Sequence, residues 1–145
     1  MNESPNIITG DFHEDERGKL IFFNKLDLSL VKRFYIIVHR DIEIVRAWQG
    51  HKQEQKWFYL LKGAFTVVLL RPDNWQDPSA DLPLEKFVLQ NGVQEVLHVP
   101  GGYANGLKAL EPNSEIMVFS SFTVEESSKD NFRFDRDKWF DWNKS

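Results

Sequence analysis

The sequence contains no cysteine, which excludes disulfides, thiol nucleophiles and thiolate metal sites. Positive charge is not in excess either. The formal net charge is -4, and this balance gives no indication of a nucleic-acid or membrane surface as a partner. No stretch approaches the roughly 20 apolar residues that a membrane-spanning helix needs. Residues Met1 to Gly10 lack a positive region followed by an apolar run, so we predict no signal peptide and a cytoplasmic location.

Helical periodicity is also scarce, because no segment keeps apolar residues at helical spacing over several turns. The best helical candidate is the short polar segment Val124–Asp130. Short apolar runs separated by turn signals dominate instead. They predict strands at Leu20–Asn24, Arg33–Val38, Ile42–Trp48, Lys56–Leu61, Ala64–Leu70, Glu85–Leu89, Glu95–Val99, Gly106–Leu110 and Glu115–Phe119. Many short strands with few helices predict an all-β sandwich or closed jelly roll, in one domain over residues 1–145.

Turn signals and aromatic residues indicate how these strands are connected and covered. Lys62-Gly63 separates two apolar runs and predicts a tight hairpin. Arg71–Pro83 carries three prolines and three aspartates, so we expect a surface loop there. Phe132–Trp142 holds five large aromatic side chains. Such a tail would be costly if exposed, so we expect it to pack onto the strands or onto a second subunit.

One segment concentrates polar chemistry, the stretch Arg46–Lys56, which leaves one predicted strand and enters the next. It holds His51 and Lys52 as well as the two terminal cations. Because alternate residues of a strand share a face, positions 46 and 48 are expected to point the same way. Arg46 and Lys56 on adjacent strands can converge on a diphosphate, to which arginine offers a bidentate fork and lysine a point charge. The alternative is a surface strip of salt bridges with Glu54.

Two further segments are weaker signals when taken alone. Val99–Leu107 contains Tyr103 and Asn105 among glycines, which let a backbone approach a ligand closely, although an ordinary hairpin has the same composition. Asp15–Gly18, with Arg17 inside it, is a charged turn before the first predicted strand.

The order and spacing of these segments resemble the cupins that isomerise nucleotide sugars. These are the dTDP-4-dehydrorhamnose 3,5-epimerases and the dTDP-4-dehydro-6-deoxyglucose 3,4-ketoisomerases. The resemblance runs from about Asp11 to Trp142 and includes a Lys-Arg-x-Tyr strand at Lys32–Tyr35 and a Pro-x-Gly-Tyr-Ala-x-Gly turn at Pro100–Gly106. It implies a cupin jelly-roll β-barrel, a homodimer, and a nucleotide-sugar ligand in the synthesis of surface polysaccharide sugars.

The resemblance also implies roles for particular residues. Arg17, Arg46 and Lys56 would face the nucleotide diphosphate, while Tyr35 and His51 would line the sugar pocket. Both related enzyme groups carry a histidine three residues after the arginine, where this chain has Gln49, and an amide cannot take a proton near neutral pH. Where the epimerases have a second histidine and a tyrosine acid, this chain has Asn105 and Phe119. The protein is therefore not expected to be a standard 3,5-epimerase.

The same positions indicate whether the protein could bind a metal ion. Metal-binding cupins use three histidines and one glutamate, and the corresponding positions are Gln49, His51, Gln55 and Asn105. One imidazole among three amides is a poor set of ligands for a divalent ion. We therefore predict no metal and no other cofactor.

Three hypotheses follow. In the first, an isomerase acts on a 4-keto nucleotide sugar, with His51 as base or proton shuttle, Tyr35 as acid, and Arg46 or Lys52 stabilising an enolate. Gln49, Tyr103 and Asn105 would then contact the substrate. In the second, the acid–base set is lost and the protein only binds a nucleotide sugar through its amides and cations. In the third, the protein is an unrelated small-molecule cupin.

Overall fold

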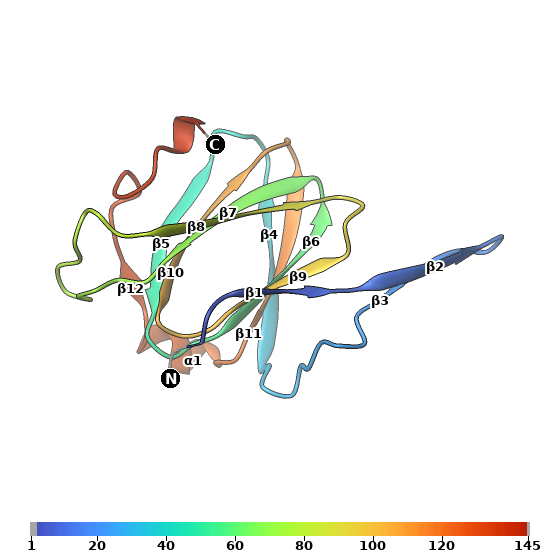
Figure 1. Cartoon of the computed structure of the whole chain (residues 1–145), viewed down its shortest axis with the longest axis horizontal. Helices are drawn as coiled ribbons and strands as arrows, with labels where there is room; N and C mark the ends of the chain where they lie inside the picture. Colours follow the sequence, from blue (N-terminus) through green and yellow to red (C-terminus); the bar gives the residue numbers. More distant parts are fainter. Residues whose placement is uncertain (1–2, 145) are drawn as a thin grey trace.

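Two antiparallel sheets form the body of the protein in the computed structural model, which describes residues 3–144 (Figure 1). Residues 1, 2 and 145 of the predicted domain lie outside the described residues. The first sheet has the order β1 (Asn6–Thr9), β9 (Glu95–Val99), β6 (Lys56–Lys62), β11 (Ser114–Ser120) and β4 (Arg33–His39). The second has the order β12 (Phe132–Arg133), β5 (Val45–His51), β10 (Tyr103–Ala109), β7 (Ala64–Leu70) and β8 (Leu84–Gln90). The all-β prediction is therefore confirmed, and no strand pairing among residues 3–144 joins the two sheets into a closed barrel.

The main apolar core lies between the sheets, because alternate side chains of each strand point inward. In β11, for example, Ile116 and Val118 are fully buried while Met117 between them is only half-buried. Full burial of such a side chain contributes roughly 1.5–3 kcal/mol. The buried members of this core are Phe58, Phe65, Val67, Leu69, Leu89, Leu97, Val99, Tyr103, Leu107, Ala109, Ile116 and Val118.

A second apolar cluster covers the outer face of the second sheet. Trp48 of β5 lies 5.5 Å from Trp142 and 5.4 Å from Trp139, measured between ring centroids. A side chain on Gly106 of β10 would meet the Trp142 ring at 2.5 Å, so the indole lies flush on the strand. The aromatic tail therefore packs back onto the sheet, as predicted. This cover explains why all seven residues of β7 are buried.

All nine predicted strands are present, with their ends shifted by at most three residues. The strands β1, β2 and β12 were not predicted. The charged β2 is largely exposed, and β12 has two residues, so neither shows an apolar pattern. The predicted helix is confirmed as α1 (Val124–Ser128), which starts at a capping box between Thr123 and Glu126. No helix among residues 3–144 has the length and apolar character needed to cross a bilayer.

The predicted hairpin at Lys62-Gly63 is wrong. Strands β6 and β7 follow each other there, but β6 pairs with β9 and β11 whereas β7 pairs with β8 and β10. The turn is therefore a corner between the two sheets. Gly63 has a φ of 80°, and a side chain there would collide with Ser114, so glycine fits the corner for both reasons.

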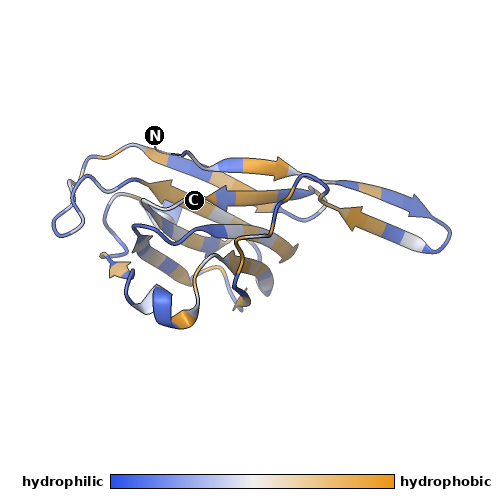
Figure 2. Ribbon diagram, turned by 90° about the horizontal axis from the view of Figure 1, so that it is seen from below, coloured by the Kyte–Doolittle hydropathy of each residue, from blue (hydrophilic) through white to orange (hydrophobic). Residues whose placement is uncertain are grey.

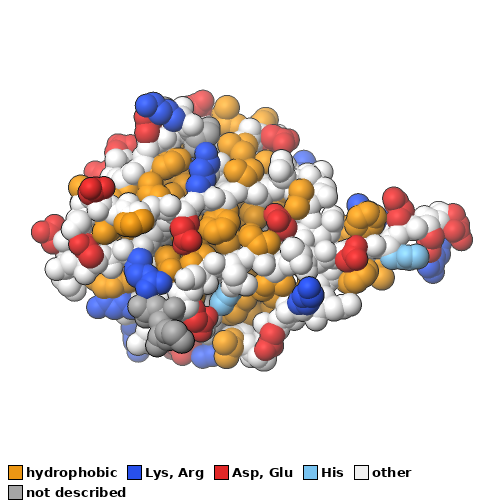
Figure 3. Space-filling model, viewed as in Figure 1, with side chains coloured by type: hydrophobic (Ala, Val, Ile, Leu, Met, Phe, Trp, Pro, Cys, Tyr) orange, Lys and Arg blue, Asp and Glu red, His pale blue; other side chains and the backbone are white. Residues whose placement is uncertain are grey.

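A separate hairpin projects from this body. It consists of β2 (Asp11–Asp15) and β3 (Gly18–Phe22) and extends well beyond both sheets in two perpendicular views (Figures 1 and 2). Figure 3 shows hydrophobic side chains near its base and charged side chains near its tip. The hairpin carries Phe12, Leu20 and Ile21, which are all exposed.

Candidate active site

A cavity of about 680 Å³ lies between β4 and β5, with its inner wall formed by β6 and β10. Its polar lining comes from five strands: Arg33 and Tyr35 of β4, Arg46 and Gln49 of β5, Lys56 of β6, Asn105 of β10 and Arg133 of β12. Apolar side chains such as Phe58 and Leu107 complete the wall. No carboxylate is among the lining residues within 3–144.

Five residues that were predicted from the sequence meet at this cavity: Tyr35, Arg46, Gln49, Lys56 and Asn105. The register of the sheets explains how. Gln49 of β5 lies opposite Asn105 of β10 in the antiparallel pairing, so both amides face the same space.

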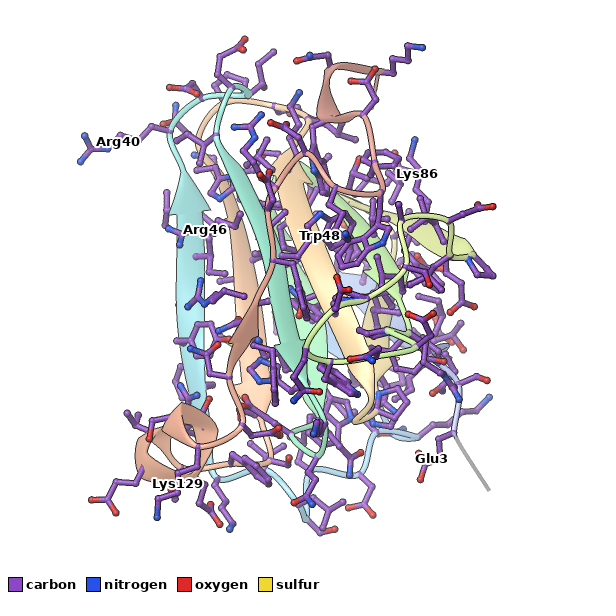
Figure 4. The ribbon with its side chains drawn as sticks, turned by 90° about the vertical axis from the view of Figure 1, so that its left-hand side faces the viewer. Glu3, Arg40, Arg46, Trp48, Lys86 and Lys129 are labelled. Carbon is purple, nitrogen blue, oxygen red and sulfur yellow. The ribbon has the colours of Figure 1, made fainter. Side chains whose placement is uncertain are left out.

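The expectation that positions 46 and 48 share a face is wrong. The pairing of β5 with β10 shifts register between Asn105 and Leu107, and such an irregularity breaks the alternation of a strand. Arg46 faces β4, while Trp48 packs in the outer cluster (Figure 4).

All four cations on the cavity are hydrogen-bonded to neutral groups. Arg33 donates from Nε to the carbonyl of Phe122 (3.0 Å). Arg46 donates from Nε to Nε2 of His39 (3.1 Å). Lys56 donates from Nζ to Oε1 of Gln49 (2.9 Å). Arg133 donates from Nε to Oδ1 of Asn131 (3.3 Å). These acceptors orient the cations without cancelling their charge, so the cavity is electrostatically suited to an anion.

The alternative of a surface salt-bridge strip with Glu54 is wrong. Glu54 is 2% exposed and accepts hydrogen bonds from Ser120 Oγ (2.7 Å) and Ser127 Oγ (2.6 Å). Its nearest cation is the Arg33 guanidinium at 3.8 Å. Among residues 3–144, neither Arg46 nor Lys56 forms an ion pair with it.

Two groups on the cavity have shifted pKa values. Burial, aided by the nearby cations Arg33 and Arg133 and opposed by Glu54, lowers the pKa of Lys56 to about 8. Burial, aided by the negative charge of Glu54, raises the pKa of Tyr35 to about 12. Tyr35 is therefore a hydroxyl donor at neutral pH.

His51 is buried at the end of β5 and is not one of the residues that line the cavity. Its ring is 3% exposed, and Nδ1 donates to the carbonyl of Asp130 (2.6 Å). That bond fixes the proton on Nδ1 and leaves Nε2 as a bare acceptor, which has no partner among the described residues. Burial, followed by the charge of Lys56, lowers the pKa of His51.

Asp130 holds the loop between β5 and β6 and was not predicted from the sequence. Its carboxylate accepts the backbone N–H groups of Lys52, Gln53 and Glu54, each at 2.8 Å. The loop therefore encloses a carboxylate and not a ligand. The ammonium of Lys52 lies over the ring of Phe132, 5.2 Å from its centroid, and Lys52 is not among the cavity-lining residues.

Two other predicted residues are also apart from the cavity. Arg17 pairs with Asp15 at 2.7 Å near the tip of the projecting hairpin. Tyr103 belongs to the main core, and its hydroxyl accepts a hydrogen bond from Arg71 (2.6 Å).

Sequence reasoning missed His39 and two cavity arginines. Arg33 lies inside the Lys-Arg-x-Tyr motif, and its alternation with Tyr35 on one strand was an available signal. Arg133 gave no such signal, because it reaches the cavity only when the tail pairs with β5 opposite Gln49. Among residues 3–144, no cluster of three or more histidines, aspartates or glutamates has the arrangement of a metal site.

Comparisons with known proteins agree with this architecture. A family model described as "FdtA: WxcM-like, C-terminal" matches residues 4–139. The chain is 24% identical over 139 residues to the "Probable low-salt glycan biosynthesis epimerase Agl13" of Haloferax volcanii, covering 89% of this chain and 86% of that protein.

Two solved structures are similar over nearly the whole chain. A dTDP sugar isomerase from Desulfovibrio desulfuricans G20 has a TM-score of 0.76 at 16% identity, covering 99% of this chain and 93% of that one. The sugar 3,4-ketoisomerase QdtA from Thermoanaerobacterium thermosaccharolyticum, solved in complex with TDP, has a TM-score of 0.70 at 19% identity, covering 92% and 90%. These likenesses confirm the cupin-like fold.

Proposed function

The chain belongs to the FdtA family (WxcM-like, C-terminal), and from this premise we propose that it isomerises a nucleotide sugar. The substrate is a 4-keto-6-deoxy nucleotide sugar, and the reaction is a metal-free proton transfer within the synthesis of surface polysaccharide sugars. The observation that carries this proposal is the cavity itself. It combines cations that have only neutral hydrogen-bond partners with a protonated phenol.

The chemistry needs a proton removed from the carbon next to the ketone, and the ketone makes that carbon acidic. Arg46 would stabilise the enolate oxygen by charge and hydrogen bonding. Tyr35 would donate a proton to that oxygen, which its raised pKa allows. Gln49 and Asn105 would bind sugar hydroxyls through their amides.

Two residues that were predicted for the chemistry, His51 and Lys52, do not line the cavity. His51 would act as a proton shuttle from outside the cavity lining, through its buried Nε2, which has no partner within residues 3–144. Lys52 would not stabilise the enolate, because its ammonium lies against Phe132.

The test is an incubation of the protein with dTDP-4-dehydro-6-deoxyglucose in deuterated water, followed by NMR of the sugar protons. Loss of the C3 proton signal is the expected result, with product peaks that distinguish the 3,4-ketoisomer from an epimer. No exchange together with no new product would contradict the proposal.

A second function, binding of a nucleotide sugar without turnover, has one observation in its favour. Gln49 and Asn105 put amides where an acid–base pair of histidines would be expected from the resemblance. The same NMR sample separates the two functions, because a pure binding protein broadens the ligand signals without any exchange at C3.

A further inference from the structure

Lys56 is an amine buried at the wall of the cavity. It begins β6, is 4% exposed, and lines the cavity together with Phe58 two residues along the strand. Within residues 3–144, its Nζ donates one hydrogen bond, to Oε1 of Gln49. Because an ammonium has three donors, this bond fixes the group in place without using all of its polar capacity.

The charge of Lys56 has no direct counter-ion among the described residues. The buried carboxylate of Glu54 is occupied by the hydroxyls of Ser120 and Ser127 and by His51 at 3.4 Å. Arg33 and Arg133 add positive charge to the same cavity. A buried ammonium in such surroundings is expensive, and its loss of a proton relieves that cost.

Charged groups near Lys56 shift its pKa in both directions. Arg33 on β4 and Arg133 on β12 favour the neutral amine, and Glu54, before β6, favours the ammonium. Burial is the largest influence, and the resulting pKa of about 8 leaves a useful fraction of free amine in mildly alkaline solution.

The other titratable groups on the cavity cannot accept a proton near neutral pH. Arg33, Arg46 and Arg133 are guanidinium groups that stay protonated, and Tyr35 keeps its proton up to about pH 12. His51 is not among the lining residues. Lys56 is thus the one lining residue within 3–144 that can present a basic lone pair to a ligand.

We propose that Lys56 is the catalytic base of the isomerisation, a role that rests on the proposed function. The neutral amine takes the C3 proton, the C3–H electron pair forms the C3–C4 double bond, and the carbonyl electron pair moves to the C4 oxygen near Arg46. Tyr35 protonates that oxygen and regains a proton from the C3 hydroxyl. The ammonium then delivers its proton to C4, which gives the 3-keto sugar with no co-reactant.

Replacement variants with chemical rescue test this role. Lys56→Ala is expected to lower kcat by about 10²–10⁴-fold, and added primary amines are expected to restore turnover according to their basicity. Lys56→Arg keeps the charge but supplies no base, so it is expected to stay inactive. Lys62→Ala is the matched control, since Lys62 ends the same strand and is exposed.

A second measurement separates this role from simple charge attraction. In the wild type, kcat is expected to rise with pH through a midpoint near 8. This rise with a midpoint near 8 should be absent from the pH profile of amine-rescued Lys56→Ala. TDP affinity, measured by calorimetry, should change little in the alanine variant.

These experiments distinguish a failure of the proposed role of Lys56 from a failure of the proposed function. An active wild type with an equally active Lys56→Ala or Lys56→Arg variant overturns the role of Lys56 alone. So does an inactive alanine variant that amines do not rescue and that has lost TDP binding. A wild type with neither exchange at C3 nor new product overturns the proposed function and, with it, this role.

Discussion

His39 controls the orientation of Arg46. It is fully buried on β4, and because its Nε2 accepts the Arg46 Nε–H, the imidazole must be neutral with its proton on Nδ1. Burial, aided by the Arg46 charge, lowers the pKa of His39 and keeps it in that form. The remaining guanidinium donors are then free to serve the cavity.

Loss of this acceptor should slow turnover, because Arg46 is proposed to stabilise the enolate oxygen. His39→Phe keeps a ring against Phe65 but removes a hydrogen bond to a charged group, which is typically about 1.5–3 kcal/mol. We expect kcat/KM for dTDP-4-dehydro-6-deoxyglucose to fall at least about tenfold. His39→Gln, which restores an acceptor oxygen, should recover part of the activity. Equal kcat/KM in the phenylalanine variant would show that Arg46 needs no such support.

The lowered pKa of Lys56 leads to a prediction about stability as well as one about catalysis. Its pKa falls from an ordinary 10.5 to about 8 on folding, so the folded protein holds fewer protons than the unfolded chain between these values. Stability therefore rises with pH across that window, and the cost of the buried ammonium is complete below about pH 8. The difference between the two pKa values corresponds to about 3 kcal/mol in the free energy of unfolding.

Lys56→Met should remove this cost. Urea unfolding at pH 7 should show the methionine variant to be more stable than the wild type by up to about 3 kcal/mol, and the difference should shrink toward pH 10. A variant that is less stable at pH 7 would mean that Lys56 has a counter-ion in solution.

At the scale of single residues, the sequence predicted the polar groups that belong to one motif. Arg46, Gln49 and Lys56 were recognisable because all three lie in the segment Arg46–Lys56, and all three line the cavity. Trp48 was placed on the wrong face because a register shift in β5 and β10 depends on the partner strand. Arg133 was missed because it belongs to a strand with two residues.

At the scale of elements, Asp130 joins the end of α1 to the loop between β5 and β6. Three backbone N–H groups donate to its carboxylate, and its own carbonyl accepts from His51. Asp130→Ala would leave these buried donors unsatisfied, at about 1–3 kcal/mol for each one that water cannot reach.

We therefore expect Asp130→Ala to lower the free energy of unfolding by about 3 kcal/mol or more in urea titrations. Asp130→Asn keeps one acceptor oxygen and should be intermediate. Asp135→Ala is a suitable control, because Asp135 is exposed and accepts one local N–H from Asp137. A loss below about 0.5 kcal/mol, the usual range of surface changes, would show that water replaces the carboxylate.

The elements also show where sequence reasoning ends. Apolar runs and turn residues located the nine strands, because both signals are local. They gave no information on which strand pairs with which, and the corner at Gly63 was therefore taken for a hairpin. That corner is decided by the distant pairing of β6 with β11 and of β7 with β10.

At the scale of the whole molecule, apolar surface remains that a single chain does not cover. The outer side of β4 exposes Phe34, Ile36 and Val38 at 59%, 47% and 48%, and the projecting hairpin exposes Leu20 at 64%. Arg17 on the same hairpin pairs with Asp15 and is not among the residues that line the cavity of its own chain. A contact between Arg17 and a diphosphate therefore requires the cavity of a second copy.

A homodimer built on these surfaces is the expected state, since exposed apolar patches commonly mark interfaces. Light scattering after size exclusion should give twice the mass of one chain for the wild type. Leu20→Asp combined with Ile36→Asp should give the mass of one chain, because each aspartate would place an unpaired charge in the interface. Val124→Asp, at an equally exposed apolar residue on α1 (68%), is the control and should remain dimeric. If the double variant stays dimeric, the interface lies elsewhere, and Arg17 then has no route to a cavity.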